Sequence, residues 1–388
     1  MPGKRIALFL DGTWNNVASN TNVWRMKSLC ATGADQVTYY SAGVGTQLGQ
    51  RLVGGMFGYG LDQEVIQAYM WLMERYADGD HIFLFGFSRG AFTARSLAGL
   101  ISKCGLLKPG SPVSITQLYN RYKRGPSAPT VRELAHVKVG SLNAEDKLII
   151  KYSMAIPIWF QGVWDTVGAL GVPFGEIPVV SRSNYGFLET DLRINYTHAF
   201  QALAIDEHRS AFAPTLWRKN VKKQAGPNDT YPPRPLNQVE QRWFVGAHGD
   251  VGGGYEAGML AQIPLNWLIQ KALSLGLMFK GDVSLDGTEI QSLIHDSFSE
   301  MALGFYKLCK LGVPYFRTVG GGPIDEGDSI TTTVNETIDA SVFERWRADA
   351  SYRPDNLATW ASKVAKDDVN INSLHSSVLA DAPSTSVS

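Results

Sequence analysis

Apolar residues in the first hundred positions form short continuous runs that alternate with longer amphipathic segments. The continuous runs contain many β-branched and aromatic residues and predict strands at residues 4–10, 36–41 and 81–84. Between and after them, apolar residues recur at helical spacing and predict helices at residues 23–31, 61–76 and 91–100. Alternation of this kind is typical of a mostly parallel sheet with helices on both faces, so we expect an α/β fold.

The pattern changes after the third strand and its helix. Residues 109–154 have a mostly helical pattern and contain the basic run 121–124, so we expect a helical insertion, at about residues 105–154, that covers the site as a cap. A second candidate for such a cover is the glycine-rich, apolar segment 43–60. The alternative is that this segment is only a flexible connector.

Further elements follow in the remainder of the chain. Apolar runs predict strands at residues 155–163 and 242–246, and helical spacing predicts helices at 197–208, 264–277 and 289–303. Proline and polar residues indicate a loop over residues 214–238, and the chain looks irregular beyond residue 320. We therefore expect one domain over residues 1–310 and an irregular extension over residues 311–388, with a disordered tail after residue 379.

Composition excludes several classes of protein. The 388 residues include 36 Lys and Arg and 36 Asp and Glu, so the formal net charge is zero, which does not support a nucleic-acid partner. The three cysteines, Cys30, Cys104 and Cys309, are too few and too widely spaced for a disulfide framework or a zinc cluster. The first apolar run is too short for a signal peptide, and no stretch reaches the ~20 apolar residues of a membrane span. We expect a protein made in the cytoplasm, whose export would need a route without a cleaved leader.

Residues 85–91 (Phe-Gly-Phe-Ser-Arg-Gly-Ala) carry the clearest chemical signal. They place a G-x-S-x-G pentapeptide between a predicted strand and a predicted helix, which is the context of a nucleophile elbow. Gly86 and Gly90 allow the tight turn, and Ser88 would be pushed out of the sheet. The following helix points its positive end at the serine, where an oxyanion would form.

A serine hydroxyl becomes a good nucleophile when a histidine takes its proton and a buried carboxylate orients that histidine. With this elbow, the chain order is serine, acid, histidine. Asp165 and His248 follow Ser88 in that order, each just after a predicted strand. Because catalytic groups gather at the carboxyl ends of strands in such sheets, we expect the three side chains to meet as a triad.

Other acidic residues leave alternatives open. Asp250, two residues after His248, could be the acid, brace the loop or pair with Arg89. Asp206 and Glu207 are better interpreted as a structural ion-pair cluster at a helix end.

The segment Asp11-Gly12-Thr13-Trp14-Asn15 follows the first predicted strand. An aspartyl phosphatase would need a second acid at position 13, which is Thr13, so a phosphatase centred on Asp11 is the weaker alternative. We expect the backbone amides of Gly12, Thr13 and Arg89 to stabilise the oxyanion, with Asp11 bracing the loop through its own hydrogen bonds.

Several motifs taken together resemble one family. They are Leu10-Asp11-Gly12-Thr13-Trp14-Asn15, Gly86-Phe87-Ser88-Arg89-Gly90-Ala91 with Ala94-Arg95, Val163-Trp164-Asp165-Thr166-Val167-Gly168, Ala202-Leu203-Ala204-Ile205-Asp206-Glu207-His208-Arg209 and Trp243-Phe244-Val245-Gly246-Ala247-His248-Gly249-Asp250-Val251-Gly252-Gly253-Gly254-Tyr255. The set resembles the uncharacterised α/β-hydrolase domain shared with the phospholipase effectors of type VI secretion, over about residues 4–270.

The resemblance implies an α/β-hydrolase catalytic domain over residues 1–310, with Ser88, Asp165 and His248 as triad. It implies a serine esterase or lipase, most specifically a phospholipase, that needs no metal or organic cofactor. Implied partners are a lipid or ester substrate, a membrane surface, the secretion machinery and an immunity protein, and the implied route of export is leaderless. The chain departs from the larger effectors because it has no long C-terminal membrane-binding module. An esterase for small substrates and a non-catalytic binding protein remain alternatives.

Overall fold

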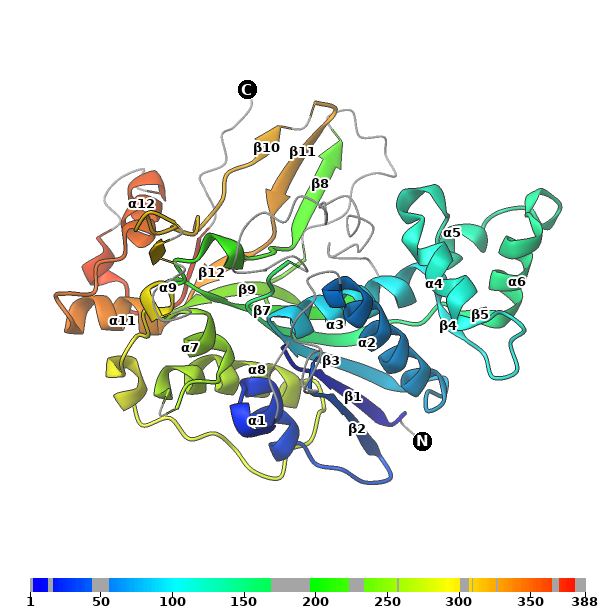
Figure 1. Ribbon diagram of the computed structural model, residues 1–388, viewed down its shortest axis with the longest axis horizontal. Coiled ribbons are helices and arrows are strands. Elements are labelled where there is room, and N and C mark those ends of the chain that lie inside the picture. The colour runs from blue at the N-terminus through cyan, green and yellow to red at the C-terminus, as the bar shows by residue number, and fades with distance from the viewer. Residues whose placement is uncertain are drawn as a thin grey trace.

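A mostly parallel sheet crosses the centre of the computed structural model (Figure 1). The structure describes residues 3–12, 17–43, 56–168, 196–222, 234–256, 258–300, 307–308, 310–325, 327–364 and 370–380. In spatial order, the strands of the sheet are β13 (Val378–Leu379), β12 (Glu336–Ile338), β9 (Val239–Phe244), β7 (Tyr196–Ala204), β6 (Ile158–Trp164), β3 (His81–Phe87), β1 (Arg5–Leu10) and β2 (Gln36–Ser41). Neighbours among these strands are parallel, except for β12 and β13.

Helices cover both faces of this sheet. The helices nearest its centre are α1 (Asn22–Leu29), α2 (Met56–Met73), α3 (Arg89–Cys104) and α8 (Gln262–Ser274). On β1, Ile6 and Leu8 pack in the cluster with α2 and α3, whereas Ala7 and Phe9 pack in the cluster with α1 and α8. Side chains of a strand alternate between faces, and here both sets are buried, as expected for a parallel sheet between two helical layers. The predicted α/β fold is confirmed.

The prediction of a helix over residues 197–208 is wrong, because most of this segment is strand β7. Its alanine-rich sequence concealed a period of two. Phe200 and Ala202 pack in one core cluster, and Ala199 and Leu203 pack in the other clusters. Pairing with β6 on one side and β9 on the other satisfies the backbone of an extended chain at this position. The decisive interactions are therefore distant in sequence.

The insertion after α3 is mostly helical, as predicted. Its elements are β4 (Leu106–Leu107), α4 (Ile115–Lys123), α5 (Val131–Leu134), α6 (Ala144–Tyr152) and β5 (Ser153–Met154). The two short strands pair with each other and close the base of the insertion. The group packs against α2 and α3 and stands at one end of the molecule beyond α3 (Figure 1). Its proposed role as a cap stays a prediction, and most of the other predicted cover, residues 43–60, lies outside the described part of the chain.

The prediction of an irregular extension after residue 310 holds for residues 310–323, which form no helix or strand, and is wrong from residue 324 onward, where strands and helices follow. β12 joins the central sheet beside β9, and α11 (Ala340–Ala348) and α12 (Asp355–Val364) pack in a third core cluster with Trp243 of β9. The carboxylate of Glu336 accepts a hydrogen bond of 2.8 Å from the Trp243 indole. A three-residue strand has too little sequence for its pattern to predict it, and tertiary burial supplies its stability. The tail beyond residue 380 lies outside the described chain.

Two other predictions need correction. The predicted loop over residues 214–238 contains β8 (Arg218–Lys222), which forms a small antiparallel sheet with β11 (Ser329–Thr333) and β10 (Ile324–Asp325). The helix predicted over residues 289–303 is replaced, where described, by the 3₁₀ turn η8 (Thr288–Gln291) and the single turn α9 (Ser297–Glu300). In both places, contacts with distant segments outweigh the local pattern.

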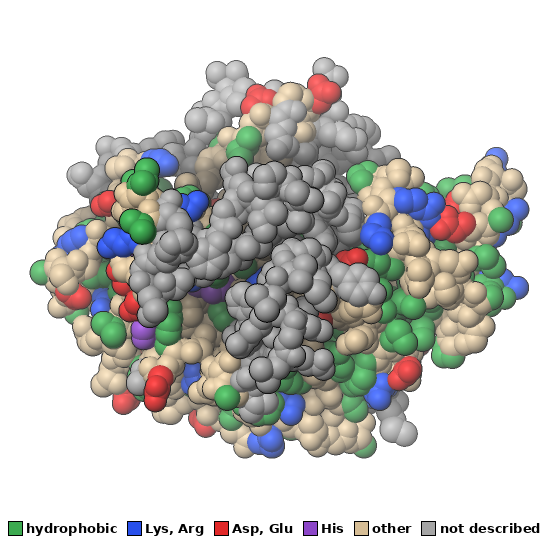
Figure 2. Space-filling model, viewed as in Figure 1, with side chains coloured by type: hydrophobic (Ala, Val, Ile, Leu, Met, Phe, Trp, Pro, Cys, Tyr) green, Lys and Arg blue, Asp and Glu red, His purple; other side chains and the backbone are tan. Residues whose placement is uncertain are grey.

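The visible face of the molecule carries basic and acidic side chains interspersed, in agreement with the balanced composition (Figure 2). Within the described ranges, no helix combines the length and the apolar character that crossing a bilayer would require.

Candidate active site

Three polar residues meet at the carboxyl edge of the sheet because three strands end there. Ser88 follows β3 and Asp165 follows β6, and the adjacent strand ends are tied by the hydrogen bond from Ser88 N–H to the Trp164 carbonyl (3.0 Å). His248 opens helix α7 (His248–Gly252), shortly after β9 ends. The sequence prediction that these residues gather at one edge agrees with the structure.

Ser88 occupies a strained turn between β3 and α3. Its φ and ψ are 58° and −123°, an unfavourable region for a residue with a side chain. A Cβ added at Gly90 would lie 2.1 Å from the Leu10 carbonyl oxygen, and one at Gly86 would lie 2.5 Å from the Gly90 carbonyl oxygen. Only glycine fits these positions, which explains the G-x-S-x-G spacing in steric terms.

Ser88, His248 and Asp165 form a continuous hydrogen-bonded chain. Nε2 of His248 lies 2.8 Å from Oγ of Ser88, and Nδ1 lies 2.5 Å from Oδ2 of Asp165. All three side chains are buried. With a proton on Nδ1, the imidazole donates to the carboxylate and presents a free electron pair on Nε2 to the serine hydroxyl. This arrangement can deprotonate the serine.

Arg317 holds the other side of the Asp165 carboxylate. Its Nη1 lies 2.6 Å from Oδ1 and its Nη2 lies 2.9 Å from Oδ2, and both side chains are fully buried. The Ala204 N–H donates a further bond of 3.1 Å to Oδ1. Burial alone would raise the pKa of Asp165, but the charge of Arg317 and the bond from His248 hold that pKa well below its usual value. Asp165 is therefore a carboxylate at neutral pH.

The imidazole of His248 is enclosed by aromatic rings and backed by a second acid. Phe87 and Phe212 lie 4.6 Å and 5.0 Å from the ring, centroid to centroid. The backbone N–H of His248 donates to Oε2 of Glu207 (3.2 Å), and Glu207 pairs with Arg209 at 2.7 Å. Burial lowers the pKa of His248, although Asp165 opposes this effect. A neutral imidazole is the form that a general base requires.

Glu207 and Arg209 form the ion pair that the sequence indicated, but at the end of strand β7 rather than at a helix end. The neighbouring carboxylate of Asp206 is also buried, accepts the Gly246 N–H (2.7 Å) and is bonded by the Tyr352 hydroxyl (3.2 Å). Burial raises the pKa of Asp206 to about 6.

Asp165 holds the imidazole of His248, and Asp250 bonds to other groups. Its Oδ2 accepts the N–H groups of Ala247 and His295, both at 3.0 Å, and its Oδ1 lies 2.6 Å from Nδ1 of His295. The ring of His295 stacks on Tyr255. Of the alternatives for Asp250, these contacts match a brace for the turn that carries His248.

The loop after β1 is held by Asp11. Its Oδ1 accepts the Gly12 N–H (2.8 Å), and its Oδ2 accepts the hydroxyls of Thr21 (2.6 Å) and Tyr40 (3.1 Å). The contacts agree with the predicted bracing role, and they also occupy the Gly12 N–H that the sequence analysis assigned to an oxyanion. Thr13, the second predicted donor, lies outside the described residues.

Arg89, the third predicted oxyanion donor, is the first residue of α3, so its backbone N–H belongs to the positive end of that helix. Its side chain is partly buried, and the loss of hydration lowers the pKa of Arg89 to about 10, while the charge of Glu64 opposes this shift. Burial raises the pKa of Glu64 to about 7. The pairing that the sequence left open between Arg89 and Asp250 is not seen where Asp250 bonds, since its side-chain partner is His295.

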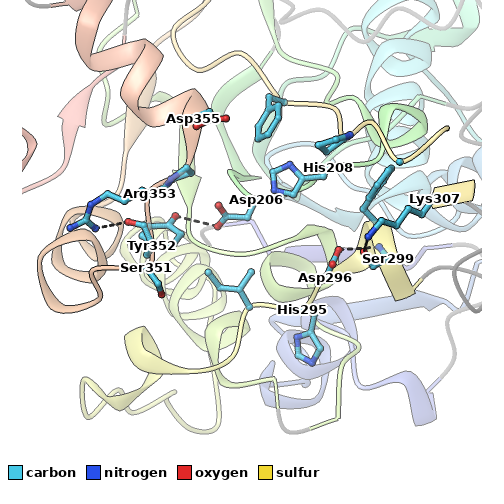
Figure 3. Close-up of a pocket in the computed structure, with 16 residues that line it drawn as sticks. Asp206, His208, His295, Asp296, Ser299, Lys307, Ser351, Tyr352, Arg353 and Asp355 are labelled. Carbon is cyan, nitrogen blue, oxygen red and sulfur yellow. Dashed lines mark hydrogen bonds between the residues drawn. The ribbon is translucent and has the colours of Figure 1, made fainter.

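A cavity of about 510 Å³ lies beside this site, between the β7 end and the C-terminal segments (Figure 3). Asp206, His208, His295 and Tyr352 line it, and Figure 3 shows the hydrogen bond between Asp206 and Tyr352. As far as the described residues go, its walls do not include the three side chains of the serine chain. In that same part of the protein, no cluster of His, Cys, Asp and Glu has the composition to hold a metal ion.

Sequence reasoning missed Arg317 and His295. Arg317 lies in a segment, residues 313–319, whose mixed apolar and polar pattern indicates no particular element, and His295 lies in a range assigned to a helix. Neither residue has a neighbour in sequence that suggests a partner. Only the packing of the C-terminal segment against β7 brings Arg317 to Asp165.

The fold and this site together define an α/β-hydrolase-like protein with its serine on a strand-to-helix elbow. The family model described as "T6SS, Phospholipase effector Tle1-like, catalytic domain" matches residues 4–271. The chain therefore belongs to the family of Tle1-like catalytic domains of type VI secretion phospholipase effectors.

Similar proteins include one curated relative and two solved structures. Uncharacterized protein YEL023C of Saccharomyces cerevisiae (strain ATCC 204508 / S288c) is 31% identical over 231 residues, which cover 54% of this chain and 32% of that protein. A crystal structure of an uncharacterized protein from Pseudomonas aeruginosa has a TM-score of 0.46 and 17% identity, over 80% of this chain and 51% of that chain. The structure of the Tle1 effector bound to the VgrG spike has a TM-score of 0.41 and 16% identity, over 86% of this chain and 92% of that chain. The chain thus spans about a third of the curated relative and about half of the Pseudomonas protein.

Proposed function

We propose that the protein is a serine hydrolase that cleaves carboxylic esters of phospholipids through Ser88, His248 and Asp165. The observation that carries this proposal is the unbroken chain of short contacts, 2.8 Å from Oγ of Ser88 to Nε2 of His248 and 2.5 Å from Nδ1 to Asp165. Membership of the Tle1-like family supports the lipid substrate. We infer the reaction class from the geometry and the substrate class from the family.

The reaction proceeds through an acyl-enzyme. Oγ of Ser88 attacks the ester carbonyl carbon while Nε2 of His248 accepts the hydroxyl proton. The tetrahedral adduct then expels the alcohol, which receives this proton from His248, and the acyl group stays on Ser88. Water, deprotonated by His248, attacks the acyl carbonyl, and the fatty acid leaves as Ser88 regains its proton. Asp165 stays ionised and stabilises the imidazolium in both halves.

The oxyanion needs backbone donors next to Ser88. The Arg89 N–H is the donor that the first turn of α3 supplies. Gly12 could contribute after its N–H leaves the Asp11 carboxylate, to which it is bonded at 2.8 Å. Thr13 stays a prediction. Substrate binding would then be coupled to a small rearrangement of the loop that Asp11 holds.

A lipid substrate requires contact with a membrane surface, and one exposed segment of this chain suits that role. Leu308, Leu311 and Val313 are 70%, 89% and 68% exposed, and Lys307 and Lys310 lie among them. Apolar side chains in water beside lysines are typical of segments that insert shallowly into an anionic lipid surface. The segment leads directly to Arg317 and so to the proposed catalytic acid.

We propose that export follows the leaderless type VI route of the family. A spike protein would then be the carrier and an immunity protein the inhibitor. The Tle1 effector has been solved bound to the VgrG spike. Mixing the purified chain with the VgrG of the same genome, followed by size-exclusion chromatography, tests this point. Co-elution is expected, and separate elution at micromolar concentrations contradicts it.

The catalytic proposal is tested by hydrolysis of a short p-nitrophenyl ester and of phospholipid vesicles. Wild type should hydrolyse both, and Ser88→Ala should lose activity by a factor on the order of 10⁶. Ser96→Ala is the matched control, because Ser96 is a buried serine on α3, the helix that follows Ser88, and the described residues offer its hydroxyl no hydrogen bond. It should keep full activity.

A folded wild type that hydrolyses no ester would favour a binding protein. Loss of phosphatase activity in Asp11→Asn, with Ser88→Ala unaffected, would favour the phosphatase alternative. Hydrolysis of the monomeric ester without any hydrolysis of vesicles would point to a small-ester esterase.

A further inference from the structure

Arg317 is a buried cation at the centre of the site, although it lies outside residues 4–271 that match the family model. Its two terminal nitrogens contact the two oxygens of Asp165 in parallel, at 2.6 Å and 2.9 Å. The same nitrogens donate to the carbonyls of Ala204 (2.8 Å) and Phe212 (2.5 Å). The fork of the guanidinium therefore binds the carboxylate, the last residue of β7 and the chain segment that follows this strand.

That segment also packs on the imidazole. The ring of Phe212 lies edge-on to His248, and the guanidinium of Arg209 stacks on Phe212 at 3.7 Å. Upstream of Arg317, the Tyr315 N–H donates to the His208 carbonyl (2.9 Å), and Nδ1 of His208 lies 3.0 Å from the Tyr315 carbonyl. Tyr315 is thus bonded to His208 and Arg317 to Phe212, which fixes the direction from which Arg317 enters.

A two-point contact constrains a carboxylate more than one bond does. With Oδ1 and Oδ2 both held by Arg317, the plane of the carboxylate cannot rotate, and the remaining electron pair of Oδ2 faces Nδ1 of His248. Asp165 has a φ of 40°, a left-handed conformation that residues with a side chain rarely adopt. Its backbone is therefore held in place by the surrounding structure and not by its own preference. The orientation of the acid depends on its partner.

We propose that Arg317 is a positioning residue of the triad, which keeps Asp165 ionised and aimed at His248, so that the C-terminal part of this chain is required for catalysis. The proposal rests on the proposed serine-hydrolase function. Arg317 does not reach the reacting atoms, since its contacts are with Asp165 and with backbone carbonyls. It acts through the acid.

The charge of Arg317 also reaches His248 through Asp165. The charged groups that face the imidazole are Asp165 after β6 and Glu207 and Arg209 after β7. Arg317 cancels part of the negative charge of Asp165, so its removal favours the imidazolium if Asp165 stays ionised. If Asp165 becomes protonated instead, His248 has no carboxylate partner until the pH is high enough to ionise Asp165. Both outcomes move the acidic limb of the kcat/KM profile to higher pH.

The test compares Arg317→Met with wild type on a short p-nitrophenyl ester between pH 5 and 9. The expected result is a kcat lower by about 10²-fold, an unchanged KM and an acidic limb moved upward by about one pH unit. Arg121→Met is the matched control, because Arg121 is a buried arginine paired with Asp146 at 2.7 Å in the insertion. It should lower the melting temperature and leave the acidic limb in place. An unmoved limb in folded Arg317→Met would overturn the proposal.

Two further comparisons separate positioning from folding. Arg317→Lys keeps the charge but loses the fork, so we expect a limb at the wild-type pH with kcat between those of wild type and Arg317→Met. The second comparison is between the single variant Asp165→Asn and the double variant that also carries Arg317→Met. If Arg317 acts only through Asp165, adding Arg317→Met to Asp165→Asn changes kcat less than about threefold. A further loss of tenfold or more would contradict the proposal.

An NMR titration of the His248 imidazole provides a readout that does not need turnover. Its pKa should be higher in Arg317→Met than in wild type if Asp165 stays ionised, and the Nδ1 proton signal should weaken if Asp165 becomes protonated. An unchanged titration and an unchanged Nδ1 signal would overturn the role of Arg317. Absence of ester hydrolysis by wild type, with the NMR changes present, would instead refute the hydrolase function and leave the positioning contact intact.

Discussion

Asp250 and His295 are joined side chain to side chain, with Oδ1 of Asp250 2.6 Å from Nδ1 of His295. This contact, with the bonds from the N–H groups of Ala247 and His295, ties the turn that carries His248 to a segment 45 residues further along the chain. It assigns Asp250 to the support of the turn, while Asp165 contacts the imidazole of His248.

This division of roles predicts different effects for the two acids. Asp250→Ala leaves the buried N–H of Ala247 and the partly buried N–H of His295 without this acceptor, so the free energy of unfolding should fall by about 1–3 kcal/mol, with kcat within tenfold of wild type. Asp165→Asn should lower kcat by about 10⁴-fold, because the imidazole loses the carboxylate that selects its tautomer. Urea unfolding and ester kinetics measure both. If folded Asp250→Ala were as inactive as Asp165→Asn, the assignment would be wrong.

The elbow predicts a strong steric effect at Gly90. A Cβ there would lie 2.1 Å from the Leu10 carbonyl oxygen and 2.4 Å from that of Asp11, and both belong to the central backbone. Gly90→Ala should therefore lower the free energy of unfolding by more than about 4 kcal/mol or prevent folding. Gly140→Ala is the control, since nothing lies within 4 Å of its added Cβ. Thermal melts compare the two, and a Gly90→Ala protein with the wild-type melting temperature would refute the elbow geometry.

The pH profile of hydrolysis should reflect the buried imidazole. Burial lowers the pKa of His248 against the opposing effect of Asp165, and only the neutral ring accepts the Ser88 proton. Activity should persist below the ordinary histidine pKa of about 6.5, and kcat/KM should decline only as pH falls further. Stopped assays with a non-ionising ester between pH 4.5 and 8 measure the limb. A midpoint at or above about 6.5 would disagree with this environment.

Asp206 should make the protein less stable as pH rises. Burial raises its pKa from 3.8 to about 6, so between these values the unfolded chain releases a proton that the folded chain keeps. The contribution of Asp206 to stability therefore falls from pH 4 to pH 6 and is level above that. Between pH 4 and pH 6, the free energy of unfolding of Asp206→Asn should rise by about 1–3 kcal/mol relative to that of wild type. Urea unfolding at pH 4.5 and pH 7.5 gives the difference, which must increase with pH for the prediction to hold.

Much of the fold was predictable because local pattern and tertiary burial agree in the first hundred residues. The strands β1, β2 and β3 and the helix α1 begin and end within about three residues of their predicted bounds, while α2 begins at Met56 instead of residue 61 and α3 ends at Cys104 instead of residue 100. The order of Ser88, Asp165 and His248, each beyond a strand, also predicted which side chains would meet, since parallel strands end at one edge. Steric rules for glycine explain the elbow from sequence alone.

The three-dimensional arrangement decided the strands and side-chain contacts that the local pattern did not predict. Strand β7 is extended because β6 and β9 flank it, and β12 is a strand because β9 offers it an edge. Arg317 reaches Asp165 across 152 residues of chain, in a segment whose local pattern indicates no element. Local sequence encodes backbone propensity and the alternation of buried side chains. The pairing of a buried acid with its cation depends on which distant segments share one desolvated volume, which folding of the whole chain settles.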